Sequence, residues 1–327
     1  MEYETKVSYS LLSAEYLAAE VAQRYELAAG STRLTTPAYI RFYSRGSNDI
    51  FLLQANGASY ALRVSPVLRT PESVEIETDL LAQMAKSGLT VCAAVAQRDG
   101  SLYFSVAAPE GRRCCVVFPF INGQENMPLR TPDQGFRIGM ATGAFHRWGD
   151  GADPPGADKI SVPALNLDQS WIEQLPIDGS ERDFLGRACQ ETQKRLYDPA
   201  RKWDRGLCHG DLVGGNTITT ADGRTWLFDF EYCGVGLRGY DLATLWDSIE
   251  EDSRAEVWDA FVKGYQSERP LGLDDIDHRP LFSVARQVWL IAAQQRIATH
   301  WGWLWERDRM RDNLRRLRQL WNGVEAG

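Results

Sequence analysis

Two carboxylates and one amide, in a fixed order, are the most informative residues of this 327-residue chain. Asp211 and Asn216 lie in the polar stretch 208–216, and Asp229 follows a short apolar run. Phosphoryl transfer needs one carboxylate to orient the attacking hydroxyl, and an amide and a second carboxylate to hold a metal ion. Because Mg²⁺ prefers such oxygen ligands, the pattern predicts that Asp211 is a base and that Asn216 and Asp229 are magnesium ligands. The alternative is a polar turn followed by an aspartate at the end of a strand.

His209 directly precedes this pattern and is included among the candidate catalytic residues. We expect it to brace the loop through hydrogen bonds rather than to carry a proton, since Asp211 already serves the acceptor hydroxyl. Cys208 and Cys233 flank the site without a histidine and an acid at nucleophilic spacing. Thiol catalysis is therefore not expected, and both cysteines are predicted to be packing residues.

A cation that could bind nucleotide phosphates lies at the end of an apolar strand. Arg63 lies near the end of the segment 60–64, and Glu77 lies on the helix that follows. We expect Arg63 to reach the α- and β-phosphates of a nucleotide and to pair with Glu77. The alternative is a surface arginine at the edge of a sheet.

Two further segments are candidate nucleotide contacts. Gly46, Ser47 and Asn48 form a turn between two strands, and their backbone amides could cover phosphates, although a single glycine is a weak form of phosphate-binding loop. Phe118 and Phe120 are expected to place their side chains in the core, with a backbone that is available to the adenine base.

Composition limits the possible partners and compartments. The chain has 36 Lys and Arg against 44 Asp and Glu, a net charge of -8, which disfavours binding to polyanions and anionic bilayers. The six cysteines show no paired spacing, as expected for reduced thiols. We find no apolar run long enough to cross a bilayer. These features predict a cytoplasmic protein with no nucleic-acid or membrane partner.

The first 120 residues have the pattern of a twisted antiparallel sheet. Asn56 and Gly57 tolerate positive φ and predict a two-residue hairpin turn. Breaks in the pattern predict a hinge at 117–123, between domains at 1–120 and 121–327. Strands are predicted at 39–43, 49–54, 59–64, 101–106 and 114–118.

Helices flank this sheet. Ser13 is predicted to cap a helix that ends at Gly30. Thr70 and Pro71 supply an N-cap and a first-turn proline for a second helix, which ends at Gly88. This second helix is expected to cover one face of the sheet.

The second domain is predicted to be mainly helical. A helix begins at Thr131, and Gly139 and Gly143 give it a narrow face that another backbone could approach closely. The exceptions are a loop at 153–164 and two short strands on either side of the turn at 221–223.

These ordered motifs resemble the aminoglycoside phosphotransferase and choline kinase superfamily, which has a protein-kinase-like fold. The similar segments are the phosphate-cation strand at 60–64, the C-helix at 77–88, the hinge at 117–123, the helix at 139–146, the catalytic loop at 209–216, the metal motif at 229–231 and the D-L-A support at 241–243. The helical tail is also similar to the branch that includes homoserine kinases and stress-response Ser/Thr kinases. One departure is Arg63, where many members carry lysine.

The resemblance implies an α+β, bilobal fold, with a small N-terminal lobe formed by an antiparallel sheet and a C-helix, and a larger, mainly helical C-terminal lobe. It also implies ATP as the donor and Mg²⁺ as the cofactor. Three functions are compatible with these motifs. The chain could phosphorylate the hydroxyl of a small molecule, phosphorylate Ser or Thr of a protein or peptide, or bind nucleotide as a scaffold without catalysis.

Overall fold

The computed structural model describes residues 7–27, 39–152, 169–301 and 303–325. The chain divides into two compact units, Met1–Gly123 and Gln124–Gly327, and each is described by itself. The expected loop at 153–164 lies outside the described residues.

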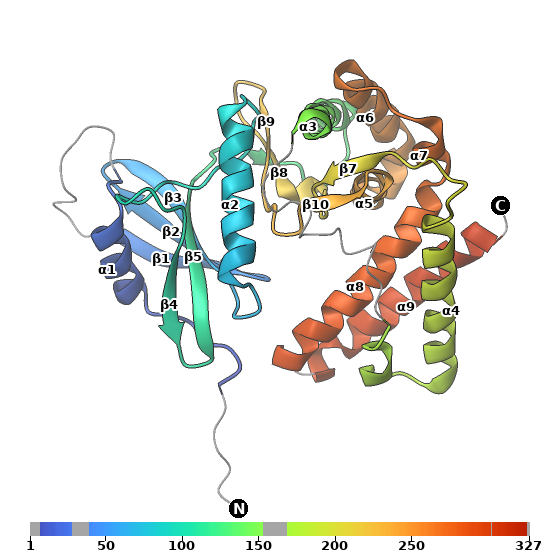
Figure 1. Cartoon of the computed structure of the whole chain (residues 1–327), viewed down its shortest axis with the longest axis horizontal. Coiled ribbons are helices and arrows are strands. Elements are labelled where there is room, and N and C mark those ends of the chain that lie inside the picture. Colours follow the sequence, from blue (N-terminus) through green and yellow to red (C-terminus); the bar gives the residue numbers. More distant parts are fainter. Residues whose placement is uncertain (1–6, 28–38, 153–168, 302, 326–327) are drawn as a thin grey trace, which may run out of the picture. The chain divides into compact units, whose positions relative to one another are not determined.

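The first unit contains a five-stranded antiparallel sheet in the order β1-β2-β3-β5-β4 (Figure 1). Asn56 and Gly57 have φ values of 49° and 81° and form the expected tight turn between β2 and β3, because this hairpin needs positive φ at both positions. The strands are β1 (Tyr39–Arg45), β2 (Asp49–Ala55), β3 (Ala58–Val64), β4 (Phe104–Ala108) and β5 (Gly111–Pro119).

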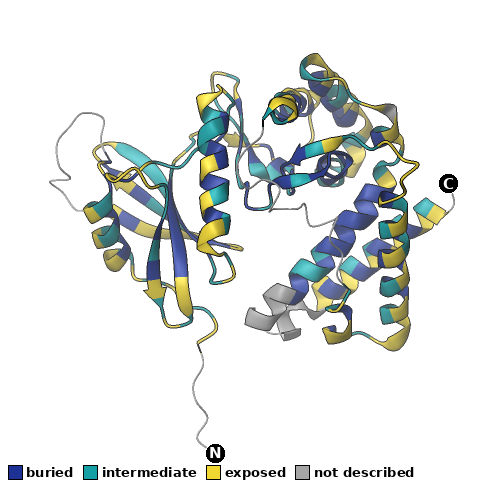
Figure 2. Cartoon of the chain, in the orientation of Figure 1, coloured by how far each residue is buried: buried dark blue, intermediate teal, exposed yellow. Residues whose placement is uncertain are grey.

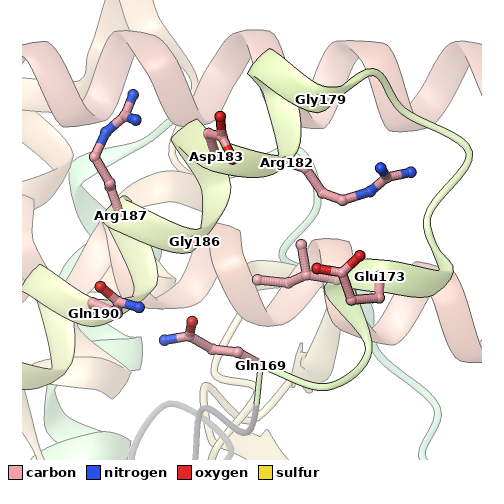
Figure 3. Close-up of a pocket in the computed structure, with 9 residues that line it drawn as sticks. Gln169, Glu173, Gly179, Arg182, Asp183, Gly186, Arg187 and Gln190 are labelled. Atoms are coloured by element: carbon pink, nitrogen blue, oxygen red, sulfur yellow. The ribbon is translucent and has the colours of Figure 1, made fainter.

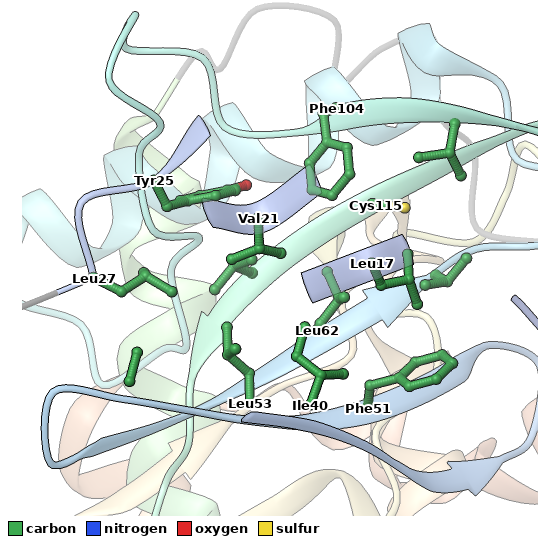
Figure 4. Close-up of a cluster of buried hydrophobic side chains, with 14 residues drawn as sticks. Leu17, Val21, Tyr25, Leu27, Ile40, Phe51, Leu53, Leu62, Phe104 and Cys115 are labelled. Carbon is green, nitrogen blue, oxygen red and sulfur yellow. The ribbon is translucent and has the colours of Figure 1, made fainter. Parts of the chain in front are cut away.

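The helix α1 (Ala14–Arg24) packs against one face of this sheet. Its Leu17 and Val21 are fully buried among strand residues such as Leu53 and Leu62 (Figure 4). The Ser13 hydroxyl caps the helix, as expected. The helix ends at Arg24, earlier than the expected end at Gly30, because the next residue is extended and the Arg24 carbonyl accepts a hydrogen bond from the backbone of Arg98 (2.9 Å).

The helix α2 (Pro71–Lys86) packs against the other face. Thr70 caps it, and the chain turns away at Gly88 with a φ of 85°, so the predicted helix is confirmed. Successive residues of a strand point to opposite faces. Accordingly, Val116 packs against Val74 of α2, whereas Val117 belongs to the core beneath α1.

One predicted strand begins later than expected. The segment 101–106 was assigned to a strand, but β4 begins at Phe104. The Asp99 carboxylate accepts hydrogen bonds from the backbone N–H and the hydroxyl of Ser101, and Gly100 has a φ of 88°. This local turn competes with sheet pairing and delays the strand.

The second unit is mainly helical, as expected. Its helices are α3 (Pro132–Gly151), α4 (Gly179–Leu196), α5 (Gly239–Ser248), α6 (Arg254–Glu268), α7 (Leu273–Asp277), α8 (Arg279–Trp301) and α9 (Trp303–Glu325), with short 3₁₀ segments η3 (Ile172–Gln174), η4 (Gly214–Asn216) and η5 (Glu251–Ser253). Figure 2 shows how strongly α5 is buried, and Gly239–Leu245 has no exposed residue.

The helices α3 and α6 approach each other more closely than side chains would allow. A Cβ atom on Gly139 would lie 2.2 Å from the carbonyl oxygen of Phe261, and one on Gly143 would lie 2.7 Å from that of Tyr265. The close backbone approach that was expected for these two glycines is therefore confirmed.

Two small antiparallel sheets hold the polar motif. β7 (Arg205–Cys208) pairs with β10 (Gly234–Leu237), while β6 (Gln124–Glu125), β8 (Thr217–Thr219) and β9 (Thr225–Leu227) form the second sheet. The sequence predicted β8 and β9 with the turn between them, but it did not predict β7 and β10. A glycine-rich segment such as 234–237 carries little strand signal, because glycine is depleted in strands.

All six cysteines are free thiols and buried, and they include Cys208 and Cys233. In the part of the chain that the structure describes, no helix has the length and apolar character needed to cross a membrane.

Candidate active site

The loop that carries Asp211 begins where β7 ends, at Cys208. Gly210 has a φ of 82°, and a Cβ atom there would lie 2.2 Å from the carbonyl oxygen of Tyr232. Glycine is needed for both reasons. Leu212 is fully buried and anchors the loop beneath the partly exposed Asp211.

Asp211 and Asn216 are in direct contact. The side-chain amide of Asn216 donates hydrogen bonds to the backbone oxygen of Asp211 (2.9 Å) and to its Oδ2 atom (3.1 Å). Both bonds use the amide nitrogen of Asn216, so its amide oxygen, Oδ1, points away from Asp211. The loop therefore orients both a carboxylate and an amide oxygen.

Asp229 lies beside this pair. The preceding residue, Phe228, donates its backbone N–H to the carbonyl oxygen of Asn216 (3.2 Å). Asp229 itself has a φ of 64°, a left-handed conformation that aspartate adopts more readily than most residues. The backbone of Phe228 thus joins the end of the β8–β9 hairpin, where Asp229 follows, to the loop that carries Asp211 and Asn216.

The chemistry of this set fits magnesium. Asn216 and Asp229 offer an amide and a carboxylate oxygen, the hard ligands that Mg²⁺ prefers. Among the described residues, no group of three or more His, Cys, Asp or Glu side chains could hold a metal alone. Asn216 and Asp229 therefore match an ion that takes its remaining ligands from phosphate and water.

His209 is buried, and both of its ring nitrogens are used. Nε2 donates to the carbonyl oxygen of Phe228 (3.0 Å), and Nδ1 accepts from the backbone N–H of Asp211 (3.3 Å). Burial lowers the pKa of His209, which favours the neutral ring that this pattern requires. The ring braces the loop, in line with the expected structural role.

Asp241, at the start of α5, anchors the same loop. Its carboxylate accepts the backbone N–H groups of His209 (2.6 Å) and Gly210 (2.9 Å). Burial raises the pKa of Asp241, but the hydrogen bond from His146 and the other favourable contacts outweigh it, so the pKa is lowered. Asp241 thus remains an acceptor.

A chain of buried hydrogen bonds extends from Asp241 to the α3–α6 contact. His146 Nε2 donates to Asp241 Oδ2 (3.1 Å), His146 Nδ1 accepts from the hydroxyl of Tyr265 (2.9 Å), and that oxygen accepts from Arg269 (3.2 Å). Each donor meets an acceptor, so one set of proton positions satisfies all three hydrogen bonds.

Arg286 is a contact of Asp211 that was not predicted. This residue of α8 is buried, and its Nη2 atom pairs with Oδ1 of Asp211. The guanidinium lies over the ring of Trp289, 4.4 Å from the centroid. The oxygen it contacts is not the one held by Asn216.

In the first unit, Arg63 and Glu77 form the expected pair. Two bonds of 2.7 Å join the guanidinium of Arg63 to the two carboxylate oxygens of Glu77. Both residues are buried, and Arg63 also stacks on Phe118, 5.1 Å from the ring centroid. Arg69 adds a second cation to Glu77 (2.6 Å), which sequence reasoning missed.

The turn at Gly46, Ser47 and Asn48 is partly closed on itself. The N–H of Gly46 donates to the carbonyl oxygen of Asn48 (3.0 Å), so this amide holds the turn. Asp49 beside it is buried and pairs with Arg113 (2.9 Å). These contacts fix the turn at the end of the β1–β2 hairpin.

The interpretation of Phe120 as a core residue is wrong. Its side chain is 40% exposed, and its backbone N–H already donates to the carbonyl oxygen of Ser59 (3.1 Å). Phe120 follows β5, the last strand of the first unit, at a point where the core beneath α1 has ended. Phe118 is half-buried and lies against Arg63.

A groove of about 520 Å³ lies along α4 and η3 (Figure 3). Arg182 and Asp183 are among the residues that line it, but none of the predicted site residues is. It is a separate surface feature.

The sequence pattern of the phosphotransferase enzyme family matches residues 40–281. This match spans most of the chain, including both units and the loop with Asp211. The chain belongs to this family. As a member, it is a phosphotransferase, and its protein-kinase-like fold agrees with the architecture described above.

Relatives of this phosphotransferase occur in several bacteria. An uncharacterized protein of Deinococcus radiodurans is 32% identical over 308 residues, which cover 90% of this chain and 85% of that protein. A homoserine kinase of Mesorhizobium japonicum is 26% identical, with 72% of this chain and 73% of that enzyme covered.

Solved structures show the same fold. An amicoumacin kinase in complex with AMP-PNP, Ca²⁺ and amicoumacin has a TM-score of 0.74 at 18% identity, covering 93% of both chains. A microcompartment-associated aminopropanol kinase has a TM-score of 0.70 at 25% identity, covering 86% of this phosphotransferase and 89% of that chain.

Proposed function

We propose that this phosphotransferase transfers the γ-phosphate of ATP to the hydroxyl of a small molecule, with Mg²⁺ as cofactor. The observation that supports this most strongly is the contact between Asp211 and Asn216, together with the backbone bond from Phe228, the neighbour of Asp229, to Asn216. Asp211 would accept a hydrogen bond from the acceptor hydroxyl, aim its oxygen at the γ-phosphorus and take the proton late in the transfer.

Asn216 and Asp229 would hold the magnesium ion through oxygen atoms. When bound, the ion neutralises charge on the nucleotide phosphates. Asn216 would serve two partners, since its amide nitrogen binds Asp211 and its amide oxygen remains for the metal. His209 and Asp241 hold the backbone that carries Asp211, and their roles are structural.

Arg63 is proposed to contact the α- and β-phosphates. Its pairing with Glu77 fixes the guanidinium in one orientation, which suits a planar group that binds phosphate oxygens in pairs. We retain backbone contacts from Gly46, Ser47 and Asn48 as a further proposal. Phe118 would contribute an apolar surface to the nucleotide.

The acceptor is proposed to be a small hydroxyl compound. Homoserine and aminopropanol kinases are among the similar proteins, and their names describe small-molecule substrates. A panel of amino alcohols, hydroxy amino acids and hydroxylated antibiotics with radiolabelled ATP tests this choice. Labelling of a peptide or protein, with none of these compounds phosphorylated, would favour a Ser/Thr kinase. Nucleotide binding without any transfer would favour the scaffold.

Replacement of Asp211 tests the mechanism. Asp211→Asn keeps the size and shape of the side chain but removes the base, so we expect kcat to fall about a thousandfold or more. Binding of the magnesium nucleotide, measured by calorimetry, should change little. Asp222→Asn is the matched control, because Asp222 lies on the exposed turn between β8 and β9. Wild-type turnover in the Asp211 variant would refute the assignment.

A further inference from the structure

Both oxygens of the Asp211 carboxylate are held, and by different parts of the second unit. Asn216, in the same loop, donates to Oδ2 (3.1 Å). Arg286, from α8 and 75 residues away in sequence, donates to Oδ1. A carboxylate held at both oxygens cannot rotate about its Cβ–Cγ bond without breaking one of the two contacts.

The environment of Arg286 keeps it at this position. The residue is 7% exposed, and a buried cation needs a charged or hydrogen-bonding partner. The ring of Trp289 lies under the guanidinium, and that ring packs edge-on against Tyr232 at a centroid distance of 4.9 Å. The hydroxyl of Tyr240 lies 3.5 Å from Nη1. Contacts with Trp289 and Tyr240 therefore hold Arg286 in place independently of its bond to Asp211.

The catalytic loop has no cation of its own. Between Asp211 and Asn216 the chain contains only the uncharged residues Leu212, Val213, Gly214 and Gly215. The cation that pairs with the carboxylate comes from another element, because among the ion pairs of the described residues α8 supplies it.

We propose that Arg286 is a positioning residue for catalysis, which fixes the orientation of the Asp211 carboxylate toward the acceptor hydroxyl. The proposal rests on the proposed function of Asp211. Each carboxylate oxygen has two lone-pair directions, so the contacts with Arg286 and Asn216 leave one direction on each oxygen for the hydroxyl. Fixing the base in advance removes an orientational cost from the transfer step.

Loss of Arg286 should affect kcat more than substrate binding. Without it, the carboxylate can pivot about its contact with Asn216, and a small misplacement of a catalytic group can lower the rate about a hundredfold. We expect Arg286→Met to lower kcat about 10- to 100-fold, with KM for ATP within about twofold of wild type. Arg286→Lys should recover only part of the rate, because a compact ammonium cannot reproduce a stacked planar fork.

A matched control separates this role from simple stabilisation of the fold. Arg279 is also on α8, two turns earlier, and stacks on Trp246 at 3.6 Å from the ring centroid. Arg279→Met removes a stacked arginine from the same helix and should leave kcat within about twofold of wild type. A purely structural Arg286 would instead lower the unfolding midpoint while the folded protein kept its kcat.

A double-mutant cycle gives the decisive result. In the Asp211→Asn background, Arg286→Met should lower the remaining kcat by less than about twofold, because its effect acts through the carboxylate. This double variant also removes both charges of the pair, so it leaves no unpaired buried ion. Multiplication of the two single effects would overturn the positioning role, and so would an unchanged kcat in Arg286→Met while the wild type is active. A wild-type protein that phosphorylates nothing would overturn the proposed function and this inference together.

Discussion

His146 and His209 are buried and neutral, and their ring nitrogens are bonded on both sides. Burial lowers the pKa of each ring below its ordinary value of 6.5. In the unfolded chain the same rings regain the ordinary pKa, so below about 6.5 the unfolded state binds more protons than the folded state. Acidification must therefore destabilise the fold through these two residues.

We expect the free energy of unfolding to fall as the pH drops below 6.5, by up to about 1.4 kcal/mol per pH unit for each histidine. His209→Gln keeps a donor for Phe228 but cannot titrate, so its pH dependence should be shallower. Urea unfolding of wild type and variant between pH 8 and 5.5 measures the difference. Burial raises the pKa of Asp275 to about 6, which acts in the opposite direction but cancels between wild type and variant. Parallel curves would contradict the prediction.

The site residues that could be predicted from sequence are those that lie together in the chain. Asp211, Asn216 and Asp229 form one short pattern, and their residue types suggest one reaction. Arg286 could not be found in this way, because α8 contains several arginines and no spacing rule connects this one with a carboxylate 75 residues earlier. His146 gave no signal for the same reason.

The α3–α6 contact supports the catalytic loop at the level of whole helices. His146 lies on α3 and Tyr265 on α6, and their hydrogen bond is one step in the chain that ends at Asp241. The glycines of α3 allow this bond, since they let the two backbones approach. A shift of α6 would therefore disturb both the packing and the loop.

Gly139→Ala should destabilise the protein by about 1 to 3 kcal/mol, because the new methyl group would meet the Phe261 carbonyl and force the helices apart. Gly186→Ala is the control. Gly186 is also inside a helix, but a Cβ atom there meets nothing within 4 Å, so we expect a gain of about 0.5 to 1 kcal/mol. Denaturant unfolding measures both changes. Equal effects of the two substitutions would rule out the close contact.

Element prediction succeeded where local rules determine the structure. The turn at Asn56 and Gly57 and the cap at Thr70 follow from backbone preferences, which are visible in the sequence. The start of β4 and the pairing of β7 with β10 depend on competing hydrogen bonds and on distant partners. The exposed Phe120 was misassigned because hydrophobicity alone does not reveal where a core ends.

At the scale of the whole molecule, ligand binding should be visible in stability. A ligand that binds only the folded state raises the free energy of unfolding by about 2.7 kcal/mol at 100 times its Kd. The proposed metal ligands lie in the second unit and the proposed phosphate cation Arg63 in the first. Substitution of a metal ligand should therefore reduce the part of the stabilisation that needs Mg²⁺. Substitution of Arg63 should reduce the part that does not.

Asp229→Asn should abolish most of the rise in Tm that Mg²⁺ adds to an ATP analogue, while leaving the rise due to the analogue alone. Asparagine tolerates the positive φ at this position, so the backbone should be preserved. Thermal unfolding with the analogue, with and without Mg²⁺ or EDTA, measures the two parts, and Asp222→Asn is again the control. A full magnesium effect in Asp229→Asn would exclude this residue as a ligand.

The six buried thiols can also report local unfolding of the protein. Three of them (Cys92, Cys114 and Cys115) belong to the first unit, and three (Cys189, Cys208 and Cys233) to the second. Burial raises the pKa of Cys92 to about 12, and such a sulfur resists alkylation until the surrounding structure opens. Labelling rates followed cysteine by cysteine would therefore tell which half of the enzyme opens first, with no engineered probe.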